Sequence, residues 1–445
     1  MKNRYTFLCL LFFILIGNFT YSQSKFTLKN DLKSQKIKFK LLSNLIVIPI
    51  EINGKELSFI LDSGVSSTVL FNLLPSDSLQ LKNVETVFLQ GLGSGNDVEA
   101  LLSKDNTFRL KNIHNPKQNL FIIIHDKIDL SAKLGETIHG IIGYDLLKDF
   151  IVKIDYSNQV IKFYDPIKYK YSNCRKCETF ELDFYKNKPF INAHASIYEN
   201  QDLFPIKLLI DSGGSDALWL FENSKEQIQC PQLNFVDYLG EGLSGSIYGK
   251  RSRINKFKLG TFEFKEPTAA FPDSTSIAFV KTYKERNGSL GGKILKRFKV
   301  IFDYPNKKIT LKKNRHFNEH FNYNMSGIDL VYHGQILVKE REETTFKVER
   351  GFESNDATKI VLSYDYKYRF KPSYKINQIR EGSPAHEVGL MKDDVLISIN
   401  SNLAYKYKLE ELMYFFYNQE DDKIRLQIER DGVPMKFEFR LRKMF

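Results

Sequence analysis

Short apolar segments separated by turn residues run through most of this chain. The segments are rich in Ile, Val, Leu, Phe and Tyr, and Gly, Asn, Asp or Pro separates one from the next. Apolar runs of this length between turn residues are typical of β-strands rather than of helices. Clear examples are residues 45–52, 57–61, 120–124, 150–154 and 160–164. We therefore expect a mainly β protein.

One pattern of strand and turn occurs twice. An apolar run leads into Asp-Ser-Gly at residues 62–64 and again at residues 211–213. Farther along, each copy has a second glycine motif, and the two motifs align without a gap so that Gly143 matches Gly291. A repeat of this length has the size of a domain lobe and is far longer than the unit of a solenoid.

The repeat divides the chain into units. We place lobe one at about 24–170 and lobe two at about 171–315, which leaves a third unit from 316 to 445. In each lobe we expect one short helix after the second glycine motif, at 145–148 and at 293–297.

The two aspartates of the repeat offer a way to hydrolyse a peptide bond. Two carboxyl groups within hydrogen-bonding distance cannot both ionise cheaply, so one keeps a proton while the other stays charged. The charged group can deprotonate a water molecule while the protonated group polarises a substrate carbonyl. If the fold brings Asp62 and Asp211 together, no metal is needed for this chemistry. The alternative is that Asp-Ser-Gly only forms turns at two strand ends.

Each lobe also has a glycine-rich hairpin between its two motifs. Strand-like residues flank both hairpins, which places the glycines at a tip. We interpret residues 90–95 and 241–245 as flaps that cover a substrate, although an ordinary turn would explain either hairpin by itself. The tip residues are Gly91, Leu92 and Gly93 in the first lobe and Gly242, Leu243 and Ser244 in the second.

The order of these motifs resembles that of the retropepsin-like aspartic peptidases. The resemblance covers about 40–315 and rests on the paired Asp-Ser-Gly tripeptides, the paired hairpins and the apolar segments that end at Gly143 and Gly291. It implies two homologous acid-protease β-barrel lobes, each of which supplies one catalytic aspartate.

The resemblance also implies roles for the residues beside the aspartates. The hydroxyls of Ser63 and Ser212 would cross-brace the two loops, and Gly64 and Gly213 would allow the tight turns.

The next residue in each loop departs from the usual pattern. Val65 and Gly214 stand where relatives often have a hydroxyl that can donate a hydrogen bond to the carboxylate. Such a bond stabilises the charged form, so its loss should raise the pKa values of the pair. The alternative is that Ser66, Ser67 or Ser215, which are close in sequence, supplies the missing donor.

A second resemblance concerns residues 316–445. Within them, the segment 376–400 resembles the PDZ domains of bacterial envelope proteases. We expect one helix to open at 383–385, where Ser-Pro-Ala provides a cap and a first-turn proline, and a second helix at 409–417. A charged, tyrosine-rich insertion would occupy about 333–372.

This second resemblance implies a peptide-binding loop. The backbone amides of Ser326, Gly327 and Ile328 would receive the C-terminal carboxylate of a peptide, which could add as a strand beside them. The alternative is a PDZ fold that serves only as a packing partner.

The first residues are typical of a secretory signal peptide. Lys2 and Arg4 precede an apolar core that is too short to span a membrane, and small residues follow it. We therefore expect residues 1–22 to be removed during export to the periplasm or the extracellular space, and we expect no membrane span in the remainder.

Charge and cysteine content change this picture little. The net charge of +12 is scattered along strand-like segments, which favours a solvated surface over a nucleic-acid interface. Cys174 and Cys177 lie between the lobes, where they could form a local disulfide or, alternatively, a redox pair. The histidines lack the spacing of metal ligands, and we expect no cofactor.

The leading hypothesis is an aspartic endopeptidase that cleaves peptide or protein substrates through Asp62 and Asp211, with a PDZ domain that recruits the substrate. The rival hypothesis is a protein of the cell envelope that binds peptides in the same places but has weak activity or none.

Overall fold

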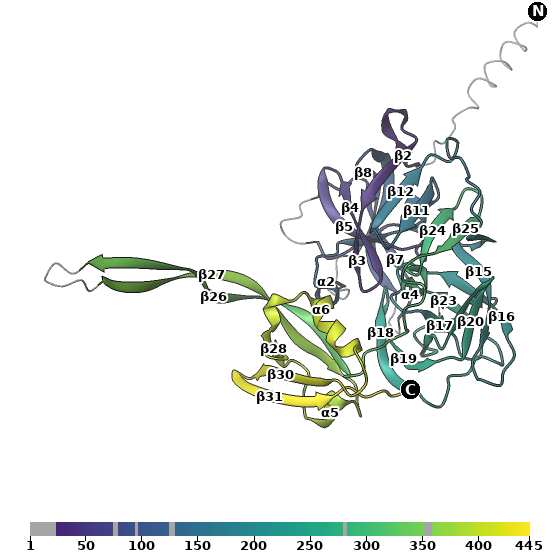
Figure 1. Cartoon of the computed structure of the whole chain (residues 1–445). Coiled ribbons are helices and arrows are strands. Elements are labelled where there is room, and N and C mark those ends of the chain that lie inside the picture. Colours follow the sequence, from purple (N-terminus) through teal and green to yellow (C-terminus); the bar gives the residue numbers. More distant parts are fainter. Residues whose placement is uncertain (1–23, 74–78, 94–96, 124–129, 279–282, 351–357) are drawn as a thin grey trace, which may run out of the picture.

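Strands dominate the computed structural model, which describes residues 24–73, 79–93, 97–123, 130–278, 283–350 and 358–445 (Figure 1). The helices within these ranges are one or two turns long, so the mainly β prediction is confirmed. The expected signal peptide and residues 94–95 of the first flap lie outside the described residues.

The first lobe is built on a large sheet. Among the described strands the order is β1-β9-β6-β10-β5-β4-β8-β7, with β3 paired to β4. Most positions of β4 and β5 are buried apolar residues, as expected for strands at the centre of a sheet. The strands are β1 (Thr27–Leu28), β3 (Lys40–Leu42), β4 (Leu45–Ile52), β5 (Lys55–Leu61), β6 (Val69–Leu70), β7 (Val84–Leu89), β8 (Val98–Leu110), β9 (Ile113–Ile122) and β10 (Gly140–Ile142).

The second lobe repeats this plan. Its described strands follow the order β18-β19-β22-β17-β23-β16-β15-β20-β21, with β14 paired to β15. The strand before Asp-Ser-Gly pairs in parallel with the strand before the second glycine motif in both lobes, β5 with β10 and β16 with β23. The strands are β14 (Asp183–Tyr185), β15 (Lys188–Ser196), β16 (Phe204–Ile210), β17 (Leu218–Leu220), β18 (Phe235–Gly242), β19 (Gly245–Arg253), β20 (Lys256–Leu259), β21 (Phe262–Lys265), β22 (Thr268–Pro272) and β23 (Gly288–Leu290).

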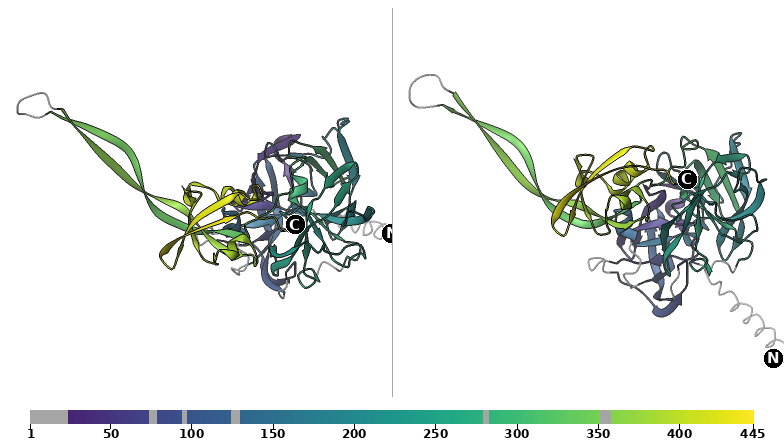
Figure 2. Two further views of the ribbon diagram at one scale, coloured as in Figure 1. Left: turned by 60° about the horizontal axis from the view of Figure 1, so that its bottom comes forward. Right: turned by 90° about the horizontal axis from the view of Figure 1, so that it is seen from below.

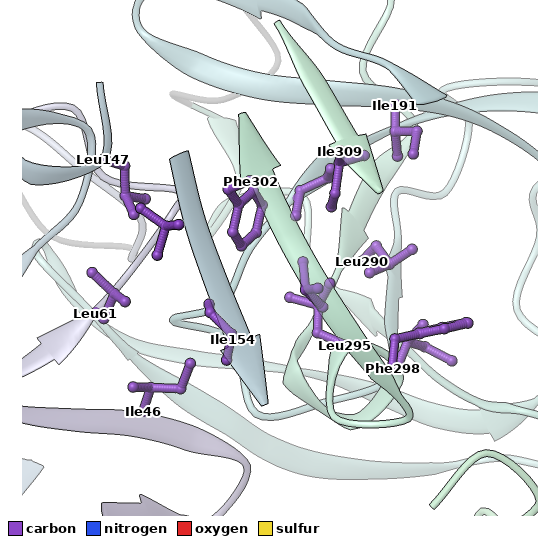
Figure 3. Close-up of a cluster of buried hydrophobic side chains, with 14 of the residues drawn as sticks. Ile46, Leu61, Leu147, Ile154, Ile191, Leu290, Leu295, Phe298, Phe302 and Ile309 are labelled. Atoms are coloured by element: carbon purple, nitrogen blue, oxygen red, sulfur yellow. The ribbon is translucent and has the colours of Figure 1, made fainter. Parts of the chain in front are cut away.

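A third sheet joins the lobes, and sequence analysis does not predict it. Its order is β13-β25-β24-β11-β12-β2, so that β11 of the first lobe pairs antiparallel with β24 of the second. Side chains from both lobes therefore pack in one core, which includes Ile46 and Leu61 of the first lobe and Leu290 and Phe302 of the second (Figure 3). The strands are β2 (Ser34–Lys38), β11 (Ile151–Asp155), β12 (Val160–Tyr164), β13 (Cys177–Glu181), β24 (Phe298–Asp303) and β25 (Lys308–Lys313).

The helices of the repeat begin directly after its second glycine motifs. Gly143 and Gly291 are the N-cap residues of α3 (Tyr144–Leu147) and α4 (Gly292–Leu295), which start one residue earlier than expected. A Cβ at position 143 would lie 1.9 Å from the carbonyl oxygen of Asp62, so only glycine fits this close approach. One further helix of the first lobe is α2 (Leu130–Leu134).

The C-terminal unit has its own sheet and core. The order of its described strands is β26-β27-β28-β30-β31, with β29 paired to β28. Ser383 caps α5 as expected, since its side chain accepts a hydrogen bond from the N–H of His386. The elements are β26 (Ile328–Arg350), β27 (Thr358–Ile379), α5 (Pro384–Glu387), β28 (Val395–Ile399), β29 (Asn402–Leu403), α6 (Leu409–Tyr414), β30 (Lys423–Arg430) and β31 (Val433–Arg440).

The expected insertion at 333–372 is a continuation of this sheet. β26 and β27 stay paired far beyond the rest of the unit, and the resulting two-stranded ribbon projects away from the body of the protein (Figure 2). No helix in the described part of the chain is long and apolar enough to cross a membrane.

Candidate active site

Each lobe positions its aspartate in the same way. Asp62 follows β5, and its backbone N–H donates a hydrogen bond of 2.8 Å to the carbonyl of Ile142 in β10. Asp211 follows β16, and its N–H donates to the carbonyl of Leu290 in β23 over 2.9 Å. The two motifs of each lobe thus meet through a parallel strand pair.

A symmetric pair of serines ties the two aspartate loops together. The hydroxyl of Ser63 accepts a hydrogen bond from the N–H of Ser212 (3.0 Å) and donates to the carbonyl of Ile210 (2.7 Å). The hydroxyl of Ser212 accepts from the N–H of Ser63 (2.9 Å) and donates to the carbonyl of Leu61 (2.8 Å). Both serines are buried, so water does not compete for these bonds. This is the cross-brace that the resemblance implies.

The brace brings the two carboxyl groups into contact. The side chains of Asp62 and Asp211 form a hydrogen bond with each other, and the N–H of Gly64 donates to Oδ1 of Asp62 over 2.6 Å. A Cβ at position 213 would lie 2.3 Å from Oδ2 of Asp62. The glycine of the second Asp-Ser-Gly is therefore required by the carboxyl group of the opposite lobe.

Burial changes the ionisation of both aspartates. Removal from water, followed by repulsion from Asp211, raises the pKa of Asp62 to about 7. Removal from water also raises the pKa of Asp211, although the positive charges of Arg286 and Lys188 oppose this shift. A single proton is then shared near neutral pH, with Asp62 as the donor and ionised Asp211 as the acceptor. Such a pair can serve as general acid and general base.

The two predicted flaps contact each other. The N–H of Ser244 donates to the carbonyl of Leu92 over 2.8 Å, and the N–H of Gly91 donates to the hydroxyl of Ser244 over 3.2 Å. A Cβ at position 242 would lie 2.1 Å from the carbonyl oxygen of Leu92, so Gly242 permits this approach. The described parts of the flaps are therefore joined by backbone contacts.

Each flap places a leucine on the opposite lobe. Leu92 of the first lobe packs against Trp219 and Phe221 of the second lobe. Leu243 of the second lobe packs against an apolar cluster of the first lobe that includes Leu45. The two hairpins thus exchange leucines between the lobes.

Two cations beside the aspartates, the buried Arg286 and the half-buried Lys188, were not predicted from sequence. Lys188 interacts electrostatically with both carboxyl groups, and Arg286 interacts with that of Asp211. Neither residue belongs to a recognisable motif. The only sequence signal is that Arg286 stands shortly before the second glycine motif of its lobe.

The structure corrects the expected carboxylate-binding loop of the C-terminal unit. The N–H groups of Ser326 and Gly327 both donate to Oδ1 of Asn324, at 3.0 and 3.1 Å. The N–H of Ile328 donates to the hydroxyl of Ser326 at 3.0 Å. Because the loop satisfies its own amides, it offers none of the three to a peptide carboxylate. The side chain of Asn324 takes the place expected for that carboxylate.

The described cysteines form one disulfide and leave one free thiol, that of Cys230. Cys174 and Cys177 form a disulfide. Burial raises the pKa of the Cys230 thiol to about 12, so this residue stays protonated at neutral pH. Among the described residues, no group of three or more His, Cys, Asp and Glu side chains could hold a metal ion.

Comparisons with known proteins agree with the geometry of the first lobe. A sequence model of the family described as aspartyl protease matches residues 48–146, which include Asp62, the first flap and Gly143. No protein of curated function matches the chain by sequence.

Among solved structures, the crystal structure of an aspartic proteinase from Irpex lacteus is a distant neighbour. It aligns with a TM-score of 0.41 and 13% sequence identity, over 65% of this chain and 100% of that one. Residues 48–146, with the strand order and aspartate loop described above, therefore have an aspartic-peptidase-like fold.

Proposed function

We propose that this chain is an aspartic endopeptidase. The observation that carries the proposal is the hydrogen-bonded pair of Asp62 and Asp211, which the symmetric serine brace holds at the lobe interface. Ionised Asp211 would take a proton from a water molecule, and protonated Asp62 would polarise the carbonyl of the scissile bond. The attack needs no covalent intermediate, because the water itself is the nucleophile.

The flaps would exclude bulk water from this reaction. Their contacts join the two lobes above the aspartates, so a peptide must separate Leu92 from Ser244 to enter. Closure over a bound peptide would strengthen the electrostatic interactions of the carboxyl groups.

We further propose that the C-terminal unit is a PDZ-like module that acts on the second flap. Its signature segment and the capped helix α5 support the PDZ assignment. Phe235, at the start of flap strand β18, packs in the core of this module, and the side chain of Gln378 donates to the hydroxyl of Tyr248 in β19 over 3.0 Å.

Export of the chain is part of this proposal. The Cys174–Cys177 disulfide supports it, because such bonds persist in oxidising compartments outside the cytoplasm.

The test is a comparison of Asp62→Asn with the unchanged chain and with Asp202→Asn. An amide cannot share the proton, so cleavage of an unfolded protein substrate should fall at least about 100-fold in Asp62→Asn. Asp202 is exposed and lies on a loop, so its variant controls for the loss of one charge. New peptide termini are measured by mass spectrometry. Cleavage that survives in Asp62→Asn, or that is missing in the unchanged chain, would contradict the proposal.

A further inference from the structure

The two cations beside the aspartates, Lys188 and Arg286, have no counterpart in the first lobe. Lys188 begins β15 directly after the turn 186–187, and Arg286 precedes β23. The first lobe, whose strands follow the same plan, has Leu45 at the start of β4 and Ile138 before β10. One side of the dyad is therefore apolar, whereas the other side is cationic.

Aromatic packing brings the two cations together. The ring of Tyr283 stacks on Tyr185 (4.4 Å between centroids) and meets Phe190 (4.8 Å), and these two residues flank Lys188 along the chain. The N–H of Arg286 donates to the carbonyl of Tyr283 over 3.0 Å. The turn before Lys188 is itself fixed to the first lobe, since the hydroxyl of Ser66 donates to the carbonyl of Lys186 over 2.7 Å.

Arg286 also lies beneath the first flap. Its guanidinium covers the ring of Phe221 (5.0 Å), and Phe221 packs with Leu92 of the flap tip. The same guanidinium donates to the hydroxyl of Ser289 over 2.7 Å. Ser289 lies in β23, next to Leu290, whose carbonyl accepts the hydrogen bond from the N–H of Asp211. A peptide that separates the flaps from the aspartates would therefore pass next to Arg286.

In the described part of the chain neither cation forms an ion pair, although both interact at longer range with the carboxyl groups of the dyad. Arg286 donates only to the carbonyl of Gly288 and to Ser289, which are neutral. A buried cation with neutral partners has a high desolvation cost, and an incoming carboxylate would offset it through a charge-assisted, bidentate bond.

From this geometry we propose that Arg286 and Lys188 form a subsite for a substrate carboxylate next to the scissile bond. The carboxylate belongs to an Asp or Glu side chain or to the C-terminus of a short peptide. The inference rests on the proposed function, because it assumes that a peptide lies across the aspartates. It adds that the substrate is acidic near the cleaved bond.

The test uses non-cleavable peptides in which a hydroxyl-containing isostere replaces the scissile bond. One peptide has Glu beside the isostere, a second has Gln there, and both have amidated C-termini. A third has no Glu but ends in a free carboxylate at the same position. The affinities are measured by calorimetric titration of the full chain. The Glu peptide, the free-carboxylate peptide or both should bind at least about tenfold more tightly than the Gln peptide. The peptide that binds more tightly identifies the source of the carboxylate.

Substitutions of Arg286 and Lys188 test whether these residues cause the preference for a carboxylate. Arg286→Gln and Lys188→Gln should each reduce the ratio of affinities, whereas Arg286→Lys, which keeps the charge, should retain part of it. Lys186→Gln is the matched control, because Lys186 is an exposed lysine two residues from Lys188, and its ratio should not change. Melting temperatures verify that each variant is folded.

Equal affinities of the three peptides for the unchanged chain would overturn the subsite, as would a failure of all three to bind. A preference that persists in the double variant with both Gln substitutions would also overturn it. Since binding of isosteres needs no turnover, a chain that prefers the carboxylate but cleaves no ordinary peptide would contradict the proposed function and leave the subsite intact.

Discussion

The proton shared by Asp62 and Asp211 should set the pH dependence of activity. Because burial raises the pKa of Asp62 to about 7, this group keeps its proton below that pH and loses it above. The protonated form must polarise the carbonyl, so kcat/KM should fall about tenfold per pH unit on the alkaline side of pH 7. A pH profile with a neutral substrate measures this limb, and a profile that is flat between about pH 7 and 9 would contradict it.

The acid limb of the same pH profile should report the ionisation of Asp211, and substitutions of Gly214 test this assignment. A Cβ at position 214 would lie 3.5 Å from Oδ2 of Asp211, so a serine hydroxyl there is close enough to donate to this carboxylate. Such a bond favours the ionised form and should lower the pKa of Asp211. Gly214→Ser should therefore move the acid limb to lower pH, whereas Gly214→Ala, which has no hydroxyl, should not.

Sequence predicts the proximity of Asp62 and Asp211 well and the residues around them poorly. Asp62 and Asp211 stand in a repeated motif, and the two copies of a repeat occupy equivalent positions in their lobes. Lys188 and Arg286 differ from their counterparts in the first lobe, so the repeat contains no signal for them. Their proximity depends on Tyr283, whose aromatic contacts join segments that are far apart in sequence.

At the scale of elements, the contact between the flaps should control access to the aspartates. The hydroxyl of Ser244 accepts the hydrogen bond from Gly91, and this side chain is buried. Ser244→Ala removes one bond between the flaps but keeps the backbone bond to Leu92. One hydrogen bond contributes about 1 kcal/mol, so peptide affinity and the rate of flap opening should change by about two- to tenfold.

The measurement for the flap variant is KM and kcat for a peptide substrate, together with the melting temperature. Ser246→Ala is the control, because Ser246 lies on the same hairpin but bonds Glu241 of its own flap. Identical kinetics in Ser244→Ala, Ser246→Ala and the unchanged chain would show that the flap contact does not limit access.

Elements with a strong apolar pattern were predicted almost to the residue. The expected strands 45–52 and 160–164 coincide with β4 and β12, because turn residues bound both of them. Sequence predicts the ribbon formed by β26 and β27 only as an insertion, since charged residues and tyrosines interrupt its apolar pattern. Its strands are stabilised by each other and by cross-strand contacts such as that of Arg341 over Tyr364.

At the scale of the whole molecule, Phe235 should couple the C-terminal module to the lobes. Its ring stacks on Phe445 (5.3 Å), and the guanidinium of Arg380 covers it at 3.9 Å. Phe235→Ala should cost about 3 kcal/mol or more of docking energy, because a large buried side chain is removed from an interface. The module should then unfold at a lower temperature than the lobes, as a separate transition in calorimetry.

The neighbouring residue provides the control for this coupling. Val236 follows Phe235 in β18 but is 63% exposed, so Val236→Ala should leave the calorimetric profile unchanged. If Phe235→Ala gave the same profile as Val236→Ala, the two parts would be coupled by other contacts.

The arrangement of units could not be predicted from the repeat. Helix α2 of the first lobe packs against β26, and Gly135 after it lies against Leu409 of α6. The sequence of the C-terminal module predicts that a peptide adds as a strand beside residues 326–328, at the start of β26. In the structure, the first lobe of the same protein packs against β26 instead. Surfaces that match each other are encoded by scattered residues, and no periodic pattern reveals them.

The sheet that joins the lobes also has a consequence for biosynthesis. The ribosome completes β2, β11 and β12 long before it reaches β24, so β11 emerges as an edge strand with unpaired amides and carbonyls. An exposed edge of this kind can pair with the same strand of another nascent chain. Correct folding thus depends on β24 reaching β11 before a neighbour does, and a chain truncated between the lobes would retain that open edge permanently.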